Sequence, residues 1–312
     1  MLAGVFEGPG EFHVREVPEP VCPDGGALLA VDACAVCGTD VRIARFGHAK
    51  VAPPQVLGHE VVGRVVDGVG LPRGSRAIVA PAIGCGHCRW CVAGRPNRCP
   101  ELRTIGYWYP GAFAPLLAVP PEAIAQGSLI AVPDELPDTV ACLTEPLACC
   151  LNGQELAGVG EGDRVVIVGA GPIGCLHARL AGARGAAQVV IVEARADRRE
   201  TATALGLGEV LDPAADDVRD AVIERTGGGA DVVLLAAPVP ALQAEALDWL
   251  ATGGRLSWFA GLPPDSSAVR LVTNPVHYRE LTIVGAHGST PAQNRAALEL
   301  HCGPGRWRSR RW

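Results

Sequence analysis

A glycine-rich turn between an apolar run and a helical stretch constrains the fold of this chain more than any other feature. The run Arg164–Val168 leads into Gly169-Ala170-Gly171-Pro172-Ile173-Gly174, and a helical pattern continues to Arg184. G-x-G-x-x-G between a strand and a helix is typical of dinucleotide-binding folds. Its glycines permit the tight turn, the approach of a pyrophosphate and close packing of the helix on the strand, and the helix N-terminus faces the phosphates. We expect the dinucleotide to contact Gly169, Gly171, Pro172, Ile173 and Gly174.

An acidic residue follows at the distance that this motif requires. Glu193 ends the next apolar run, about 20 residues beyond the glycines, where a carboxylate accepts hydrogen bonds from the adenosine ribose. It would repel the 2′-phosphate of NADP, which favours NAD. Three arginines just downstream argue for NADP instead, because they could bind its 2′-phosphate: Arg195, Arg198 and Arg199. We therefore include Arg198 among the cofactor-binding residues and keep NADP as the alternative.

Apolar runs alternate with helical patterns after Glu145, which predicts a parallel, doubly wound sheet. The runs are nearly continuous in Val, Ile and Leu, as expected for strands covered on both faces. The predicted strands are Arg164–Val168, Val189–Val192, Glu209–Leu211, Val232–Leu235, Leu256–Phe259 and Leu281–Val284, and the helices are Ile173–Arg184, Asp197–Leu205, Asp216–Thr226 and Pro240–Leu250. The first half differs, because its short apolar runs are interrupted by Gly and Pro, a pattern that indicates a β-rich domain.

Four cysteines lie close together in the first half. Cys85, Cys88, Cys91 and Cys99 give the spacing C-x2-C-x2-C-x7-C, which suits a closed tetrahedral Zn²⁺ site. Such a site has no open position for chemistry, so its role would be structural. The alternatives are disulfide-bonded or unrelated buried cysteines and an iron–sulfur cluster. His87, between the ligands, is interpreted as a surface residue.

Two further segments carry metal-binding side chains. They are Cys37-Gly38-Thr39-Asp40 and Gly58-His59-Glu60. A thiolate, an imidazole and a carboxylate together are the ligands of an open, catalytic zinc site. Neither segment is specific alone, because single Cys and His residues often belong to the core. The two segments indicate a catalytic zinc site because they occur in the same chain as the four-cysteine lobe and the glycine loop.

The order of these four motifs resembles the medium-chain zinc-containing dehydrogenase family, over residues 1 to about 300. Leu143–Ala148 is similar to a Glu-Pro-Leu segment of its polyol branch, the sorbitol and L-threonine dehydrogenases. The resemblance implies an α/β fold in two domains. A GroES-like, zinc-binding catalytic domain would cover 1–145 and a Rossmann NAD-binding domain 146–290, followed by an atypical C-terminal segment, 291–312.

The resemblance also implies roles for single residues. Cys37 and His59 would bind the catalytic zinc, with Glu60 as a ligand or switch and Glu145 as a third ligand, direct or through water. Thr39 would begin a proton relay to solvent.

The outer half of that relay departs from the family. Members often have His two residues after the Asp of the first motif, where this chain has Arg42, which is no base. His48 is a loose substitute. Four aromatic residues are candidates to line the substrate pocket, namely Phe46, Tyr107, Trp108 and Tyr109. The alternative is that they pack under the four-cysteine lobe.

The implied reaction is hydride transfer between NAD and a polar secondary alcohol, namely a polyol, sugar alcohol or aminocyclitol. One alternative is an aminocyclitol-antibiotic biosynthetic enzyme similar to 2-deoxy-scyllo-inosamine dehydrogenase. Others are a catalytically impaired NAD-binding homologue with only the structural zinc, and a zinc-independent reductase. Metal content separates these classes: two zinc ions per chain fit the active enzyme, one a structural site alone, and none the reductase.

The net charge and the two ends of the chain limit the kinds of partner that we expect. A net charge of −6 argues against nucleic acid, whose phosphates attract a basic surface. No signal peptide or apolar run of ~18 residues is seen, which predicts a cytoplasmic protein away from membranes. The family forms dimers and tetramers, often through the last strand of the sheet. The Arg- and Trp-bearing end departs from the family, and we interpret it as a truncated or frameshifted terminus, or as a basic interaction tail.

Overall fold

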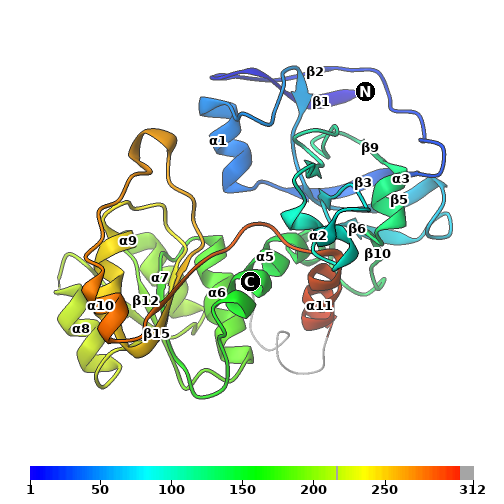
Figure 1. Ribbon diagram of the computed structural model, residues 1–312. Coiled ribbons are helices and arrows are strands. Elements are labelled where there is room, and N and C mark those ends of the chain that lie inside the picture. Colours follow the sequence, from blue (N-terminus) through cyan, green and yellow to red (C-terminus); the bar gives the residue numbers. More distant parts are fainter. Residues whose placement is uncertain (216, 303–312) are drawn as a thin grey trace. The chain divides into compact units, whose positions relative to one another are not determined.

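The computed structural model describes residues 1–215 and 217–302 and divides them into two units (Figure 1). The first unit contains residues 1–148 and the segment from Gly288 through the last described helix, and the second contains residues 149–287. The end of the chain, 303–312, lies outside the described residues. The structure therefore does not test whether this end is truncated or is an interaction tail.

The second unit is built on a six-stranded sheet in which all neighbouring strands run parallel. The strand order is β13-β12-β11-β14-β15-β16, the arrangement of two mononucleotide-binding halves. The predicted doubly wound sheet is therefore confirmed. The strands are β11 (Arg164–Val168), β12 (Gln188–Val192), β13 (Glu209–Leu211), β14 (Ala230–Leu235), β15 (Leu250–Trp258) and β16 (Thr282–Gly285).

Alternate residues of these strands face two separate cores. Val166, Val190 and Val233 belong to the cluster that also contains Ala221 and Val222 of α8 (Val218–Arg225). Val165, Ile191 and Val232 belong to the opposite cluster, with residues of α6 (Pro172–Ala183) and α7 (Ala196–Ala204). Both faces of the sheet are covered, which explains why its strands are apolar at nearly every position.

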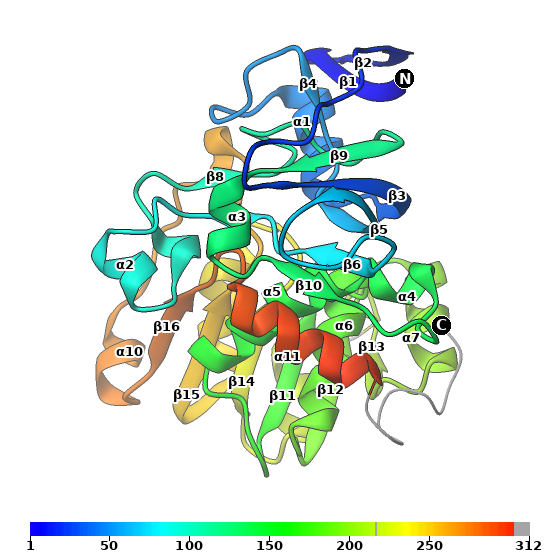
Figure 2. The ribbon, with the colours of Figure 1, turned by 90° about the vertical axis from the view of Figure 1, so that its right-hand side faces the viewer.

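The first unit is β-rich, as predicted, and Figure 2 shows its strands in blue, cyan and green. A five-stranded sheet has the order β10-β6-β5-β3-β9, a three-stranded sheet the order β2-β1-β4, and β7 pairs with β8. The strands are β1 (Leu2–Gly8), β2 (Glu11–Glu16), β3 (Ala27–Ala35), β4 (Gln55–Val56), β5 (Glu60–Gly68), β6 (Arg76–Val79), β7 (Ala82–Ile83), β8 (Arg103–Thr104), β9 (Leu116–Val119) and β10 (Leu129–Ala131).

The helices of the first unit are short, apart from the last one. They are α1 (Gly38–Phe46), α2 (Arg89–Val92), α3 (Pro121–Ala125), α4 (Asp138–Ala141) and α11 (Pro291–Cys302), with the 3-10 turn η1 (Pro96–Arg98). Helix α5 (Thr144–Leu156) runs across the division between the units. Among the described residues, no helix has both the length and the apolar character that a bilayer span requires.

Two predicted elements of the second unit differ from the structure. β15 begins at Leu250, six residues earlier than expected, because the strand continues through Gly253 and Gly254 with a register shift against β14. The helix predicted over Pro240–Leu250 is instead the short α9 (Leu242–Glu245) followed by the 3-10 turn η2 (Ala246–Trp249). The unit also holds η3 (Pro264–Ser266) and α10 (Asn274–Tyr278).

Candidate metal and dinucleotide sites

Cys37 lies at the N-terminus of α1, where the local sequence fixes its side chain. It is the residue before the helix, and its Sγ accepts a hydrogen bond from the Thr39 N–H at 3.4 Å. In return, the Asp40 carboxylate accepts the Cys37 N–H at 3.0 Å. This reciprocal cap occupies two donors that the first helical turn leaves without backbone partners. The Cys37 thiol is thereby held at the N-terminus of α1.

His59 and Glu60 reach the same place from another segment. Both are 5% exposed, and Glu60 begins β5 after the turn at Gly58, whose φ is +95°. The ligand atoms of Cys37, His59 and Glu60 lie within 4.8 Å of one another. A thiol, an imidazole and a carboxylate at this separation suit Zn²⁺, which binds S, N and O atoms at about 2.0–2.3 Å. The donor set therefore fits the predicted catalytic metal.

Asp40 orients the His59 ring. The Asp40 Oδ1 lies 3.3 Å from the His59 Nδ1, and the two side chains are 2% and 6% exposed. Burial lowers the pKa of His59, but contacts with Asp40 and Cys37 outweigh it and raise that pKa well above the ordinary value. With Nδ1 turned to the carboxylate, Nε2 is left as the ligand atom. The sequence analysis assigned Asp40 no role, although its position three residues after Cys37 is the spacing of a helix cap.

Glu145 acts on this site through its charge. Burial, and then the Glu145 carboxylate, raise the pKa of Glu60 to about 7. The charge of Glu145 also raises the pKa of His59. Within the described residues, however, Glu145 is not part of the group of mutually close ligand atoms. The structure thus brings Glu60 to Cys37 and His59, with Glu145, in the first turn of α5, nearby.

The four cysteines of the lobe converge as the spacing predicted. Their Sγ atoms all lie within 4.8 Å of one another, with 3.6 Å between Cys88 and Cys91 and 3.8 Å between Cys88 and Cys99. Four sulfurs about 2.3 Å from one zinc ion would lie roughly 3.8 Å apart, so the cluster fits a tetrahedral metal. All twelve cysteines, each within the described residues, are free thiols, so the disulfide alternative is not seen.

Backbone N–H groups point at the sulfurs of this lobe. The Cys85 N–H donates to Cys99 Sγ at 3.3 Å, and the Cys88 N–H donates to Cys85 Sγ at 3.4 Å. The backbone N–H of Cys91 is the main cause that lowers the pKa of the Cys88 thiol to about 7. These donors stabilise thiolates, the form that binds metal. His87 is exposed, as expected for a surface residue.

The aromatic candidates separate clearly. Phe46 and Trp108 are 75% and 62% exposed, and Trp108 packs under the Arg103 guanidinium. Tyr107, in contrast, has its ring centroid 5.5 Å from that of His59. Burial raises the pKa of Tyr107 to about 12. Only Tyr107 of these three side chains is thus next to the candidate zinc ligands.

The glycine loop of the second unit has the close contacts that its motif predicts. Gly169 has φ +100°, and a Cβ on Gly174 would collide with the Gly169 carbonyl oxygen. Gly171 is the residue before α6, so the free N–H groups of a twelve-residue helix begin at the loop. The loop fits a pyrophosphate, because the helix N-terminus attracts negative charge and Gly171 adds no side chain.

Glu193 is fastened to this loop. Its carboxylate accepts the Ala170 N–H at 2.6 Å and the Arg195 N–H at 2.8 Å. Each nearby arginine has an acidic neighbour: Arg195 pairs with Asp197, Arg199 with Asp212, and Arg198 lies 4.0 Å from Glu193. The carboxylate that would receive the ribose is therefore already oriented, and the arginines are partly neutralised.

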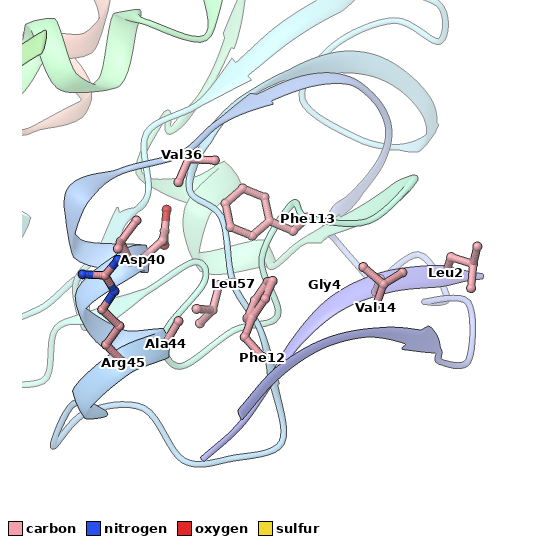
Figure 3. Close-up of a pocket in the computed structure, with 12 residues that line it drawn as sticks. Leu2, Gly4, Phe12, Val14, Val36, Asp40, Ala44, Arg45, Leu57 and Phe113 are labelled. Carbon is pink, nitrogen blue, oxygen red and sulfur yellow. The ribbon is translucent and has the colours of Figure 1, made fainter. Parts of the chain in front are cut away.

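A hollow of about 510 Å³ lies elsewhere in the first unit, beside β1, β2 and α1 (Figure 3). Apart from Asp40 and Arg45, its lining is apolar, and Figure 3 shows Phe12, Leu57 and Phe113 around it. Within the described residues, the candidate ligands Cys37, His59 and Glu60 are not among the lining residues. The hollow is therefore mostly apolar, and it shares Asp40 with the candidate metal site.

Comparison with known proteins matches both halves of the chain. Residues 23–134 match the alcohol dehydrogenase GroES-like domain, and residues 172–301 match the zinc-binding dehydrogenase family. An L-threonine 3-dehydrogenase of Idiomarina loihiensis is 34% identical over 92% of this chain and 84% of its own length. A sorbitol dehydrogenase of Halalkalibacterium halodurans is 33% identical, over 96% and 87%.

A solved structure with the same fold carries a bound cofactor. It is a Sinorhizobium meliloti protein described as a zinc-binding dehydrogenase bound to NADP, with a TM-score of 0.88 and 33% identity. The likeness covers 96% of this chain and 87% of that chain. The GroES-like and Rossmann architecture predicted from the sequence is thereby confirmed.

Proposed function

The chain belongs to the zinc-binding alcohol dehydrogenase family, whose members are NAD(P)-linked, and we propose that it oxidises a polar secondary alcohol with NAD. The substrate would be a polyol, sugar alcohol or aminocyclitol. The observation that carries this proposal is the convergence of Cys37, His59 and Glu60, whose ligand atoms lie within 4.8 Å of one another. The names of the relatives that act on L-threonine and sorbitol also support a polar substrate.

In this proposal the first unit is the catalytic domain. Cys37, His59 and Glu60 would hold a zinc ion, and Glu145 would tune the site through its charge. When bound, zinc polarises the substrate hydroxyl and lowers its pKa toward neutrality. The Thr39 hydroxyl would accept the released proton as it gives its own proton to solvent. The hydrogen bond from the Thr39 N–H to the Cys37 sulfur fixes the backbone of this residue. Asp40 keeps the His59 ring in one orientation and tautomer.

The second unit would hold the cofactor, which accepts the hydride when bound. The α6 N-terminus and the glycines bind the pyrophosphate, and Glu193 accepts hydrogen bonds from the adenosine ribose. The buried Glu193 and the paired Arg195 and Arg199 support NAD over NADP. A second zinc ion in the four-cysteine lobe would hold together a segment with little regular structure.

We also propose a homodimer or homotetramer. β16 is an edge strand of the six-stranded sheet, so its outer backbone groups are available to a second copy. Light scattering of the purified chain tests this, and a monomer at micromolar concentration would contradict it.

The activity is tested with a panel of sorbitol, xylitol, myo-inositol and L-threonine, by following NAD⁺ and NADP⁺ reduction with and without a zinc chelator. We expect reduction of NAD⁺ by at least one of these alcohols, loss of activity with chelator and recovery with added zinc. Activity that resists the chelator would indicate a zinc-independent reductase. An inactive chain that binds NAD⁺ and one zinc ion would indicate the impaired homologue.

A further inference from the structure

The apolar hollow beside β1, β2 and α1 is held open by backbone contacts between the segments that line it (Figure 3). The turn that joins β1 to β2 is fastened to α1, because the Gly10 N–H donates to the Ala44 carbonyl at 2.8 Å. Within β1, the Gly4 N–H donates to the Phe113 carbonyl at 2.7 Å. The walls of the hollow are therefore fixed before any ligand arrives, which lowers the entropic cost of binding.

Two phenylalanine rings and a leucine form the middle of the hollow (Figure 3). The rings of Phe12 and Phe113 meet edge to face, with 6.4 Å between their centroids and an interplanar angle of 88°. Leu57, which also lines the hollow, is buried. Gly4 leaves room for the Phe12 ring, since a Cβ there would lie 2.8 Å from the ring's Cζ. The middle of the hollow therefore favours hydrocarbon over polar groups.

The apolar lining of the hollow extends to the surface of the protein. Leu2, Val14 and Val36 are 60%, 72% and 65% exposed, although all three line the hollow. Apolar surface that gathers in this way on a soluble protein is typical of a binding site. The volume of about 510 Å³ lies within the range of small-molecule pockets, about 300–1,000 Å³, which favours a small ligand over the surface of a partner protein.

Arg45 gives one side of the hollow a positive charge. Figure 3 shows Arg45 of α1 on the side opposite Leu2 and Val14. Arg45 is exposed, and in the described part of the chain no carboxylate forms an ion pair with it, whereas Arg15 of β2 pairs with Glu7 at 3.1 Å. A guanidinium without an acidic neighbour can bind a carboxylate through two parallel N–H···O bonds.

Asp40, the other charged residue of the lining, is already engaged by the protein. It is 2% exposed, accepts the Cys37 N–H at 3.0 Å and lies 3.3 Å from the His59 Nδ1. Its negative charge would repel a second carboxylate placed beside it. An anionic head group is therefore favoured at the exposed Arg45 and disfavoured deeper in the hollow.

We infer that the hollow is a second ligand site, which binds a small amphipathic carboxylate of the medium-chain fatty acid type. The hydrocarbon chain packs along Phe12, Leu57 and Phe113, and the carboxylate pairs with Arg45 at the protein surface. The site uses neither the candidate zinc ligands nor the glycine loop. It is therefore independent of the proposed alcohol oxidation, and its ligand is not the alcohol substrate.

Calorimetric titration of the full chain with hexanoate, octanoate and decanoate, below the concentrations at which they form micelles, tests this site. We expect one saturable site whose Kd falls about tenfold for each two methylene groups added, the effect of burying hydrocarbon. Octanamide, which has the same chain length without the charge, should bind about fivefold more weakly than octanoate, as expected for an exposed ion pair. If decanoate shows no saturable binding, the proposal is overturned.

Two variants of α1, each with a matched control, locate the ligand. Arg45→Gln should weaken decanoate about fivefold and leave octanamide unchanged, whereas Arg42→Gln, in the same helix but not among the lining residues, should change neither. Ala44→Phe places a ring in the hollow and should raise the Kd for decanoate tenfold or more, whereas Phe at the exposed Ala49 should not. Melting curves check that each variant is folded. Equal decanoate affinity in the wild-type chain, Arg45→Gln and Ala44→Phe would place the ligand elsewhere and refute the site.

A second copy of the chain is the other candidate occupant of the hollow. Sedimentation velocity with and without decanoate distinguishes the two. A sedimentation coefficient that decanoate leaves unchanged, together with saturable binding, supports the small-ligand site. If decanoate instead dissociates an oligomer, the hollow is an interface between copies and the proposal is wrong.

Discussion

The Asp40 carboxylate lies 3.3 Å from the Nδ1 of His59, and the same carboxylate accepts the N–H of Cys37 at 3.0 Å. One buried side chain therefore caps the helix that carries one candidate zinc ligand and orients the ring of another. Partners that hydrogen-bond to metal ligands contribute to metal affinity, because they fix the tautomer and the direction of a ligating ring.

Asp40→Asn tests this relationship. Asparagine keeps the shape of the side chain but removes the charge that faces His59, so we expect zinc affinity or kcat/KM to fall by about 10- to 100-fold. Competition with a chromogenic chelator measures the affinity. The exposed Asp24→Asn is the control. A variant with wild-type zinc affinity and activity would show that Asp40 serves the helix cap alone.

The four-cysteine lobe should depend on metal for its stability. Cys91→Ser removes one of four converging sulfurs, so the chain should lose one zinc ion and melt at a lower temperature. Elemental analysis and differential scanning fluorimetry check both effects, with Cys22→Ser, outside the lobe, as control. Full zinc content in Cys91→Ser would refute a four-thiolate site.

The glycine loop gives a prediction that separates binding from folding. In Gly174→Ala the new Cβ meets the Gly169 carbonyl oxygen, which is backbone and moves only if the loop opens. We expect the Kd for NAD⁺, measured by calorimetry, to rise roughly tenfold or more, the effect of one or two lost phosphate contacts.

Gly182→Ala is the matched control, because Gly182 lies in the same helix and a Cβ there would meet nothing within 4 Å. It should bind NAD⁺ normally and gain about 1 kcal/mol of helix stability. Equal NAD⁺ affinity in the two variants would mean that the loop does not bind the pyrophosphate.

A buried histidine makes the stability of the second unit depend on pH. His177 in α6 is fully buried, and burial lowers its pKa to about 3. An unfolded chain binds a proton at this residue below about pH 6.5, whereas the folded chain does not until about pH 3. The free energy of unfolding therefore falls as the pH drops through this window, by about 1.4 kcal/mol per pH unit from this residue.

His177→Leu should remove that contribution. The melting temperature of the wild-type chain should fall more steeply than that of the variant between pH 7 and pH 5, with the exposed His13→Gln behaving like the wild-type chain. Parallel curves for the wild-type chain and His177→Leu would show that His177 does not titrate differently on folding.

The sequence predicted the second unit closely because its strands are buried on both faces. Val166 and Val190 face one core and Val165 and Ile191 the other, so each strand is a continuous apolar run. The start of β15 was missed, because Gly253 and Gly254 interrupt the apolar pattern within the strand. The candidate ligands were chosen from motifs, but no pattern in the sequence indicates the distance between residues 37 and 59, which the structure supplies.

The contacts around these ligands depend on tertiary structure. Tyr107, Trp108 and Tyr109 are equivalent candidates in the sequence, and the positive φ of Gly106 and its approach to Gly58 decide which ring contacts His59. The pairing of Asp40 with His59 likewise requires the end of β3 and the start of β5 to lie side by side, as their register from Ala35 to Glu60 shows.

Zinc stoichiometry in Cys37→Ser tests the central claim, that Cys37, His59 and Glu60 hold a catalytic metal apart from the four-cysteine lobe. The wild-type chain and the control Cys34→Ser, three residues away, should each bind two zinc ions, whereas Cys37→Ser should bind one, retain NAD⁺ binding and lose alcohol oxidation. Two zinc ions in Cys37→Ser, or one in the wild-type chain, would contradict the account.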